Sequence, residues 1–541
     1  MKLSKFKEII LLLLIVLLSV FLRFYKLGEI PNGLYVDEAV SAYNAYSVLE
    51  TGKDEYGKSF PAAFRFFGSY SPPLFTYLTA IPIKIIGLNV FSARLISAIS
   101  GVMGVIFIYF FFSGRKGLIA SAIFALSPWA IFYSRVGYEI NLGFILLSLG
   151  ILFLWLGINR PKFLFWAYVI LSLSTYGAHF ERYLAPLLLI ASIFVFKRFS
   201  LWGTIVALVI QIPNIYLLFT PAFFAKGGLF YHDLIITQAK KISMLPLSIS
   251  YSLSFIREFA SRYLGYFSPR SLFLLEDYDL QRSAPGLSVF YFWMVIPYLV
   301  GLYRLAKERK RMFNRFLIFL LVIIPIFLAL TKDPFSSQRG LPMLLPMILV
   351  IVLGFDYLLS KYKKISYVLL LVLVPISFIF LWRSYFILLP YERTKSWSWG
   401  LDKLAAEIQK RPDGKFILDQ SREKPMYIGL VFYLKYPPGK LQSAVDSTIK
   451  DNYYTNIKFD NHYEFSNFET RNIEWEKDIY IKQTLVGDEF SVSPTQATEH
   501  FLTQVFEILS PTGEIVFRGY QTNPDLKCRE TNFESIYCRK I

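Results

Sequence analysis

Long apolar runs alternate with short polar connections over the first 390 residues of the chain. Eleven of these runs are about 15 to 22 residues long, close to the length an α-helix needs to cross a bilayer. They lie near 8–25, 91–112, 117–133, 142–158, 163–177, 182–196, 200–219, 286–306, 316–331, 340–359 and 366–386. The two-residue alternation of a membrane β-barrel is absent, so the pattern predicts a polytopic α-helical membrane protein.

A twelfth apolar run, over 73–87, is short and is interrupted by Pro82 and Lys84. If this run does not span and the N-terminus is cytoplasmic, five basic clusters fall on the cytoplasmic side, as the positive-inside rule requires. They are Arg115 with Lys116, Arg160 with Lys162, Lys197 with Arg198, 307–315 and 361–364. A spanning helix would move all five outside. We therefore predict an amphipathic helix on the outer surface.

The same count assigns the remaining segments to a side of the membrane. The first run lacks small residues at a cleavage site and is predicted to be a retained first helix rather than a signal peptide. The loops over 26–90 and 220–285 are predicted to lie outside, together with everything beyond residue 389. The chain then divides into a membrane domain over 1–389 and an extracytoplasmic domain over 390–541.

The region after residue 389 is more polar and indicates a small α/β domain. A helical pattern covers 401–410, and β-type runs follow at 415–418 and 429–434. Cys528 and Cys538 are the only cysteines, and they either pair or remain as two thiols, since their spacing alone does not decide.

Composition agrees with the membrane assignment. The chain has 541 residues, of which 55% are hydrophobic and 18% aromatic, and its mean hydropathy is +0.44. The net charge of +18 could indicate nucleic-acid binding, but Lys and Arg are confined to short clusters between apolar runs. That distribution is typical of a membrane protein, so we exclude nucleic acid as a partner.

An acidic pair, Asp37 and Glu38, stands where the chain has just left the first apolar run. A helical pattern over 38–49 follows it. Carboxylates at the mouth of a membrane bundle are costly unless solvated or paired, which makes them functional candidates. The alternative is that Asp37 simply caps the helix, because Asp is a preferred N-cap residue.

Two further patterns in the outer loops involve acids. Glu139 lies between two apolar runs at the same predicted membrane face as Asp37, and two carboxylates there suit base catalysis or binding of a substrate hydroxyl. Residues 52–59 match the phosphate-loop pattern, but they follow a helix and carry Asp54 and Glu55 where phosphates should lie. We regard that match as accidental.

Cationic side chains gather at predicted outer helix ends. Each arginine taken alone could reach toward lipid headgroups, but their convergence on one face suits a phosphate-bearing lipid. These residues are Arg94, His179, Arg182 and Arg339. His179 lacks companions spaced as a metal site, so no metal ligand and no cofactor is assigned, and a divalent metal stays open. Asp277-Tyr-Asp279 is too short a motif to assign.

Four motifs together resemble the protein O-mannosyltransferase and aminoarabinose (lipid A) transferase group. The order and spacing match as far as about residue 196, then weakly over 336–340 and into the C-terminal region. The motifs are Gly33-Leu-Tyr-Val-Asp37-Glu38-Ala, Tyr70-Ser-Pro72-Pro73-Leu-Phe-Thr-Tyr77-Leu, Ala93-Arg94-Leu-Ile-Ser97-Ala, and Ser127-Pro128-Trp129 with Ser134-Arg135 and Glu139.

The resemblance implies a GT-C fold and a lipid-phosphosugar-dependent glycosyltransferase. It implies that Asp37 is the catalytic base and that Glu139 corresponds to the acid of the second outer loop. We expect Glu38 to support Asp37. Arg94 matches an arginine important in the mannosyltransferase branch, and Tyr77 is counted with it among the substrate-binding residues. The aminoarabinose branch has Glu-Lys before the proline of its surface helix, where this chain has Ser71 and Pro72, so the lysine expected to meet the donor phosphate is missing. Its charge would come from Arg65, Arg135, Arg182 or Arg339.

The chemistry is consistent with this topology. Nucleotide sugars are normally absent outside the cell, so an activated sugar would arrive on a polyprenyl phosphate. That leaving group needs cations, whereas the acceptor hydroxyl, on a lipid, protein or glycan, needs a base. We therefore expect an inverting, single-displacement transferase in the plasma membrane, with its active site outside.

Two other functions fit parts of the pattern. A transporter or flippase for lipid-linked sugars predicts charges along helix midpoints, whereas here they concentrate at one face. An oligosaccharide ligase or polymerase suits the long 220–285 loop but not the Asp37 and Glu38 opening. Neither the sugar nor the acceptor follows from the sequence.

Overall fold

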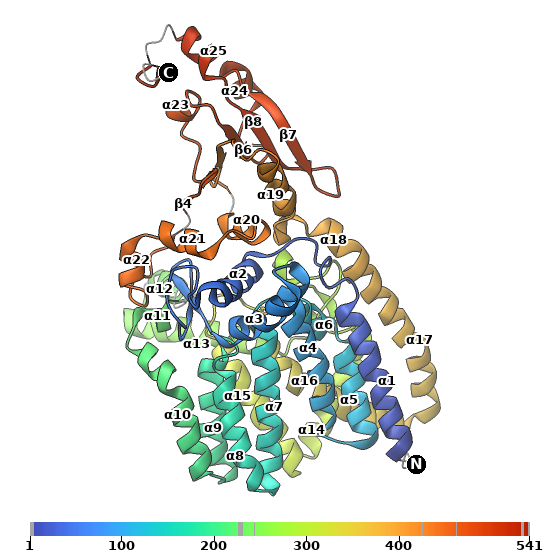
Figure 1. The fold of residues 1–541 in the computed structure, drawn as a ribbon. Helices are drawn as coiled ribbons and strands as arrows, with labels where there is room; N and C mark the ends of the chain where they lie inside the picture. Colours follow the sequence, from blue (N-terminus) through green and yellow to red (C-terminus); the bar gives the residue numbers. More distant parts are fainter. Residues whose placement is uncertain are drawn as a thin grey trace. The chain divides into compact units, whose positions relative to one another are not determined.

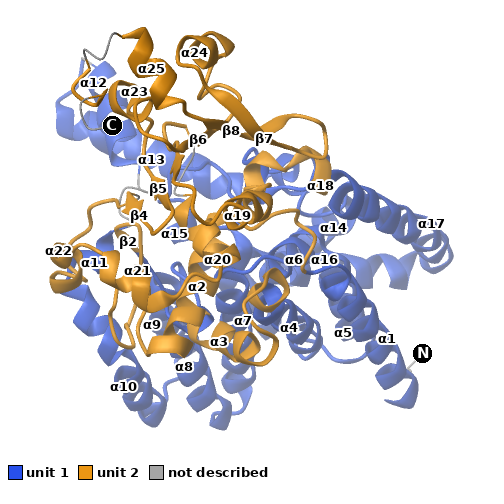
Figure 2. Ribbon diagram, turned by 45° about the horizontal axis from the view of Figure 1, so that its top comes forward, with its two compact units in different colours: residues 1–27, 70–75, 94–388 blue, residues 28–69, 76–93, 389–541 orange. Residues whose placement is uncertain are grey.

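The computed structural model describes residues 5–225, 231–242, 244–422, 426–460, 462–531 and 535–538. Figure 1 shows its helices and strands, and Figure 2 shows its two compact units. Unit 1 comprises residues 1–27, 70–75 and 94–388, and unit 2 comprises residues 28–69, 76–93 and 389–541. Unit 1 is almost entirely helical, whereas unit 2 contains a six-stranded sheet.

The long helices of unit 1 follow the predicted apolar runs. They are α1 (Lys5–Phe24), α4 (Val90–Tyr109), α5 (Gly114–Leu126), α6 (Pro128–Ser134), α7 (Ile140–Asn159), α8 (Lys162–Ser174), α9 (Glu181–Phe196), α10 (Leu201–Leu218), α14 (Val295–Lys307), α15 (Met312–Leu328), α16 (Leu344–Lys361) and α17 (Lys363–Leu381). Helices α7, α8 and α10 pack against one another in turn (Figure 1). The prediction of a polytopic helical fold is confirmed.

Five helices of the described chain are long and apolar enough to cross a membrane, and the number rises to seven if two bent pairs each count as one span. One bent pair is α5 and α6, which meet at 58°. Pro128 opens α6 there, and the Ser127 hydroxyl caps it by accepting a hydrogen bond from the Ala130 amide at 3.4 Å. The run predicted over 117–133 is therefore broken near its outer end.

The run predicted over 286–306 becomes helical later than expected. Gly286 has a positive φ of 65°, and the chain stays irregular until the 3₁₀ turn η4 (Phe292–Met294) that leads into α14. The prediction of helix over 286–291 is wrong, because apolar composition there reflects burial of Val289 and Phe290 rather than helical periodicity.

Glycines set the close packing of α14 against α16. A Cβ on Gly354 would lie 1.8 Å from the Pro297 carbonyl oxygen, and one on Gly301 would lie 2.1 Å from the Val350 carbonyl oxygen. Small residues at such crossings let helix backbones approach closely in a membrane. The long loop of unit 1 folds into α11 (Pro221–Phe224), α12 (His232–Lys241), α13 (Leu247–Gly265), η2 (Arg270–Leu274) and η3 (Leu280–Arg282).

The first outer loop contributes α2 (Val36–Thr51), β1 (Phe64–Phe66), β2 (Ser69–Ser71) and α3 (Leu74–Ile86). Helices are confirmed over both 38–49 and 73–87, as the patterns predicted. The remaining short elements before the C-terminal region are η5 (Leu341–Met343), η6 (Trp382–Leu388), α18 (Leu389–Glu392) and η7 (Lys395–Trp397).

The C-terminal part of unit 2 has a mixed sheet in the strand order β4-β5-β3-β6-β8-β7. The strands are β3 (Phe416–Leu418), β4 (Tyr463–Glu464), β5 (Phe468–Thr470), β6 (Thr484–Gly487), β7 (Thr503–Leu509) and β8 (Ile515–Gln521). Strand β3 is fully buried and runs parallel to β5 and β6, while the other pairs are antiparallel. The strand predicted at 415–418 is confirmed.

The helices of this region are α19 (Leu401–Gln409), α20 (Tyr427–Tyr433), α21 (Pro438–Ala444), α22 (Ser447–Asp451), α23 (Trp475–Asp478), α24 (Pro494–Glu499) and α25 (Pro524–Glu530). Helix α19 confirms the pattern over 401–410. The strand predicted at 429–434 is wrong, because these residues form α20. The Leu401 side chain of α19 lies so close to Gly429 that a Cβ there would come within 2.5 Å of it.

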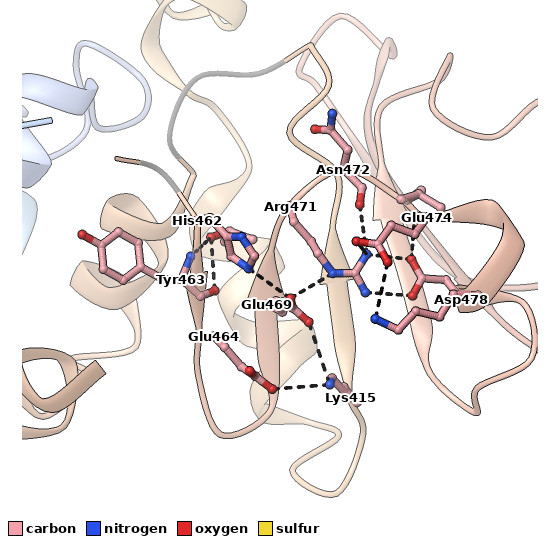
Figure 3. Close-up of polar contacts among 12 residues, drawn as sticks. Lys415, His462, Tyr463, Glu464, Glu469, Arg471, Asn472, Glu474 and Asp478 are labelled. Atoms are coloured by element: carbon pink, nitrogen blue, oxygen red, sulfur yellow. Dashed lines mark hydrogen bonds and ion pairs between the residues drawn. The ribbon is translucent and has the colours of Figure 1, made fainter. Parts of the chain in front are cut away.

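An ion-pair network joins β5 to the loop that follows it (Figure 3). The Arg471 guanidinium donates to both carboxylate oxygens of Asp478 at 2.8 Å and to Glu469 at 2.9 Å. Glu469 in turn lies 3.1 Å from His462 and 3.9 Å from Lys415. Because each acid is met by a cation, the network holds β5, an inner strand of the sheet, to the loop that follows it.

Cys528 and Cys538 form a disulfide, with their Cα atoms 5.7 Å apart. This decides between the two alternatives that the spacing left open. A disulfide is typical of a compartment outside the cytoplasm.

Candidate functional site

A pocket of about 220 Å³ in unit 1 brings together three of the predicted site residues, Glu139, His179 and Arg339. The pocket lies where α7 begins, where α8 turns into α9, and where the chain enters α16. Its other lining residues are Ile140, Ala178, Phe180, Glu181, Gln338 and Pro342.

Small residues place the walls of this pocket. A Cβ on Gly143 of α7 would lie 2.4 Å from the Ala178 side chain, and one on Gly177 would lie 2.7 Å from the Gly143 Cα. The first turn of α7 therefore crosses the α8–α9 turn at backbone contact. Asn141 fixes α7 to α4 by donating a hydrogen bond to the Ser97 carbonyl oxygen at 2.9 Å. Glu139 and His179 are held on facing segments as a result.

Arg182 is a buried arginine near this pocket. Its side chain follows Glu181 in the first turn of α9 and is 6% exposed. Among the residues that the structure describes, none accepts a hydrogen bond from any of its three guanidinium nitrogens. The guanidinium lies 5.8 Å from the centre of the Phe223 ring and interacts electrostatically with Glu139. A buried charge without acceptors is costly, so this position favours binding of an anion.

Arg339 is held by a cluster of ion pairs that the sequence patterns did not reveal. Asp333 pairs with Arg339 at 2.8 Å and with Arg282 at 3.1 Å, and Arg282 also pairs with Asp279 at 3.2 Å. Asp277 accepts a hydrogen bond from the Ser337 amide at 2.7 Å. The Asp277-Tyr-Asp279 motif thus orders the segment that carries Arg339 into the pocket.

Glu181 is a pocket residue that the sequence analysis did not single out. It is 2% exposed, and its Oε2 has no hydrogen-bond partner within the described parts of the chain. The sequence offered one indication of its role. Glu181 lies between two candidate residues, His179 and Arg182, and neighbours in one helical turn lie close together in space. Glu181 and Glu139 interact electrostatically, so two acids and two arginines converge here.

Two other arginines of unit 1 that were predicted to bind substrate donate hydrogen bonds to backbone carbonyl oxygens. Arg135 is buried and donates to the carbonyl oxygens of Leu22, Arg23 and Tyr25 at 2.9, 3.0 and 2.8 Å, which caps the C-terminus of α1. Arg94 donates to the Leu27 carbonyl oxygen at 3.1 Å. Neither lines the pocket.

The remaining predicted residues belong to unit 2. Glu38 accepts a hydrogen bond from the Tyr35 amide at 3.0 Å and so closes the first turn of α2. Tyr35 is the N-cap, which places Asp37 at the second helical position. The alternative that Asp37 is the cap is therefore wrong. The Tyr77 hydroxyl donates to the Pro61 carbonyl oxygen at 2.9 Å.

Arg65, the fourth possible substitute for the absent lysine, is also in unit 2. It is buried and donates to the Lys458 carbonyl oxygen at 2.7 Å and to Asp460 at 2.8 Å. Arg65 and Arg135 thus make structural contacts. Of the four possible substitutes, this leaves Arg339, which lines the pocket of Glu139 and His179, and Arg182, which is buried near it. Over the described parts of the chain, no group of three or more His, Cys, Asp or Glu side chains is arranged to hold a metal ion.

The phosphate-loop match at 52–59 is a polar turn that buries Asp54, Glu55 and Tyr56. Gly52 ends α2 with a positive φ of 71°, and no helix opens after it. Asp54 accepts hydrogen bonds from the Tyr56 and Lys58 amides at 3.1 and 2.8 Å, and its other oxygen accepts one from the Tyr453 hydroxyl. The Asp54 carboxylate therefore already accepts the amide hydrogen bonds of this turn that a phosphate would need. This geometry agrees with the interpretation of the match as accidental.

Glu55 lies fully buried in the same turn. It accepts hydrogen bonds from the Asn44 side chain at 2.9 Å and from the Tyr427 hydroxyl at 3.2 Å. Burial raises the pKa of Glu55 from 4.5 to about 8, and burial likewise raises the pKa of Asp54 from 3.8 to about 6. Glu55 thus holds its proton at neutral pH.

This raised pKa predicts how the stability of unit 2 depends on pH. The folded chain keeps the Glu55 proton up to about pH 8, while the unfolded chain loses it near pH 4.5, so the stabilisation is complete below 4.5 and is lost as pH rises to 8. At about 1.4 kcal/mol for each pKa unit, the change reaches a few kcal/mol. The melting temperature of Glu55→Gln should fall less than that of the wild type between pH 5 and 8.5.

Glu50→Gln is the matched control, because Glu50 is an exposed carboxylate near the end of α2, the helix that leads into this turn. Its melting curves should follow those of the wild type across the pH range. A parallel decline in wild type and Glu55→Gln would contradict the assignment of the buried proton.

Sequence comparison and structural comparison give different results for this chain. No protein-family model matches it, and no curated protein matches it by sequence. Among solved structures, ArnT from Cupriavidus metallidurans in its apo state superposes with a TM-score of 0.56 at 13% identity, over 95% of this chain and 98% of that chain. The same protein bound to undecaprenyl phosphate gives a TM-score of 0.53 at 14% identity, over 94% and 97%.

The chain has the GT-C fold. An oligosaccharyltransferase from Archaeoglobus fulgidus also matches, with a TM-score of 0.48 at 11% identity, over 96% of this chain and 74% of that chain. The GT-C prediction is confirmed by the superposition on ArnT, which includes the C-terminal region because it covers nearly the whole of both chains.

Proposed function

We propose that this chain is an integral-membrane glycosyltransferase that moves a sugar from a polyprenyl phosphate to an acceptor hydroxyl. The observation that carries the proposal is Arg182, a buried guanidinium with no described hydrogen-bond acceptor, next to a pocket that contains Arg339 and His179. Additional support comes from the GT-C fold shared with ArnT, one of whose structures holds undecaprenyl phosphate.

The pocket suits the phosphate end of such a donor. Its volume of about 220 Å³ is below the 300–1,000 Å³ typical of drug-sized ligands, which fits a phosphate or one sugar ring. Arg182 and Arg339 would donate charge-assisted hydrogen bonds to phosphate oxygens, with His179 as a further donor. The buried position strengthens these contacts and would stabilise the charge that develops on the departing phosphate.

In the proposed reaction the acceptor oxygen attacks the anomeric carbon of the donor. The new bond forms as the bond from that carbon to the phosphate oxygen breaks, so polyprenyl phosphate leaves with the electron pair. Asp37 accepts the proton of the acceptor hydroxyl, and Glu139 orients a sugar hydroxyl through a hydrogen bond. One displacement at the anomeric carbon inverts its configuration.

The membrane arrangement belongs to the same proposal. With the N-terminus in the cytoplasm, the basic connections between helices lie on the cytoplasmic side of the plasma membrane. The Glu139 pocket then lies at the outer face. Residues 390–541 would form an extracytoplasmic domain, and its disulfide suits that location. The acceptor is a hydroxyl of a lipid, a protein or a glycan.

A transfer assay in liposomes tests this function. Purified full-length chain is incubated with a polyprenyl-phosphate sugar and a mixed extract of lipids and proteins as acceptors. We expect free polyprenyl phosphate to appear together with an equal amount of transferred sugar of inverted configuration. Movement of the donor between leaflets without release of polyprenyl phosphate would instead identify a flippase.

A further inference from the structure

A second, larger cavity of about 1000 Å³ lies in unit 1. It is lined by the first turn of α1, the α4–α5 connection, the α14–α15 connection, and the last two turns of α16. These are connections that carry basic residues, and the proposed reaction uses none of them.

The two cavities lie toward opposite ends of the same helices. Along α7, Ile140 lines the small pocket and Trp155 lines the large cavity. At a rise of 1.5 Å per residue, these positions are about 22 Å apart along the helix axis. The entry to α16 likewise lines the small pocket and its C-terminal end lines the large cavity. The large cavity is therefore a separate site at the end of the bundle predicted to face the cytoplasm.

Each acid in this cavity's two ion-pair clusters is shared by two cations. Asp356 pairs with Arg115 at 2.6 Å and with Lys116 at 3.0 Å. Glu308 pairs with both Arg304 and Arg311. One acid neutralises one cation, so each cluster keeps a positive charge. Over the whole lining, five cationic side chains face three anionic ones.

Aromatic side chains form another wall of the cavity. Phe313 packs against Phe112, with ring centroids 4.7 Å apart, and against Trp155 at 5.1 Å. Tyr357 lies under the Arg304 guanidinium at 5.1 Å. Aromatic rings beside cations are typical of the interface between headgroups and acyl chains. The cavity therefore offers cations for a phosphate and an apolar surface for the groups attached to it.

We propose that this cavity binds the headgroup phosphate of an anionic phospholipid. Basic pockets between membrane helices on the cytoplasmic side recognise anionic headgroups, and this one adds the aromatic wall that a free phosphate ion would not use. The phosphate lies between the Arg115–Lys116 cluster and the Arg304–Arg311 cluster, while the acyl chains remain in the bilayer. Asp356 competes with the phosphate for Arg115 and Lys116.

Binding of a fluorescent phosphatidylglycerol to the full-length protein in detergent tests this proposal, with phosphatidylcholine as the zwitterionic comparison. The double variant Arg115→Gln with Lys116→Gln should bind phosphatidylglycerol about tenfold more weakly. The reason is that each basic residue near an anionic headgroup contributes to the free energy of binding. Asp356→Asn should tighten it several-fold, because both cations lose their competitor. The opposite signs separate recognition of the lipid from a general loss of structure.

The matched control removes two charges at the same end of the bundle. Lys363→Gln with Lys364→Gln alters exposed lysines at the start of α17 that do not line the cavity, and its affinity should equal that of the wild type. An equal loss in this control would overturn the proposal in favour of a diffuse surface effect. Displacement of the lipid by inorganic phosphate at equal concentration would overturn it in favour of a small-anion site.

Discussion

Asp37→Asn is expected to lower the rate of sugar transfer by at least about a hundredfold. A general base contributes roughly 10²–10⁴ to the rate, and an amide cannot accept the proton of the acceptor hydroxyl. The substitution keeps the size of the side chain, and Asp37 is not the N-cap of α2, so the helix should remain intact. The measurement is the initial rate of polyprenyl phosphate release in the liposome assay.

Asp402→Asn is the matched control for this change. Asp402 occupies the second position of α19, as Asp37 does in α2, so both changes remove the same favourable interaction with a helix dipole. Asp402 is exposed, and its variant should transfer sugar at the wild-type rate. Near-normal transfer by Asp37→Asn in folded protein would remove Asp37 from the mechanism.

Arg182→Met is expected to change stability and activity in opposite directions. Methionine fills much of the arginine volume and removes buried donors that lack described acceptors, so the free energy of unfolding should rise by about 1–3 kcal/mol. Transfer should fall about 10²–10³-fold, because a donor to the leaving phosphate is lost. Melting temperature in detergent and the transfer rate together measure the two effects.

Arg135→Met is the comparison variant, and its melting temperature should change in the opposite direction to that of Arg182→Met. Arg135 caps the carbonyl groups at the end of α1, so its loss leaves buried acceptors unpaired and should lower the melting temperature. A lower melting temperature in Arg182→Met as well would mean that Arg182 has a structural partner, and the anion-site interpretation would fail.

The extent to which the fold was predictable depended on periodicity. Helix α19 has one buried and one exposed face, and the pattern over 401–410 identified it. Helix α2 is buried along residues 38–45 without such a division, but Gly52 marks its end, and the pattern over 38–49 identified it as well. The residues of α20 are buried on all sides, so their apolar run carries no period that separates helix from strand. The irregular start of the run at 286 was hidden for the same reason, since burial alone produced its apolar character.

The candidate site was predictable as far as topology determines it. Counting basic clusters placed Glu139, His179 and Arg339 at one face, and the structure brings these three residues to one pocket. Sequence could not distinguish Arg182 from Arg135, because the difference is tertiary: one guanidinium lacks described acceptors, whereas the other meets the carbonyl groups of α1. Asp333 pairs with its near neighbour Arg339 and also with Arg282, which lies 51 residues away, and this second contact was likewise hidden in the sequence.

Native mass spectrometry of the full-length protein tests the central claim most directly, because it identifies the molecule at the site. Wild-type protein purified from membranes should carry a ligand whose mass and fragments are those of a polyprenyl phosphate bearing a sugar. Asp37→Asn should retain that ligand, since it binds the donor without consuming it, and Arg182→Met should lose it. Absence of any polyprenyl phosphate from the wild type, or equal occupancy in Arg182→Met, would contradict the account.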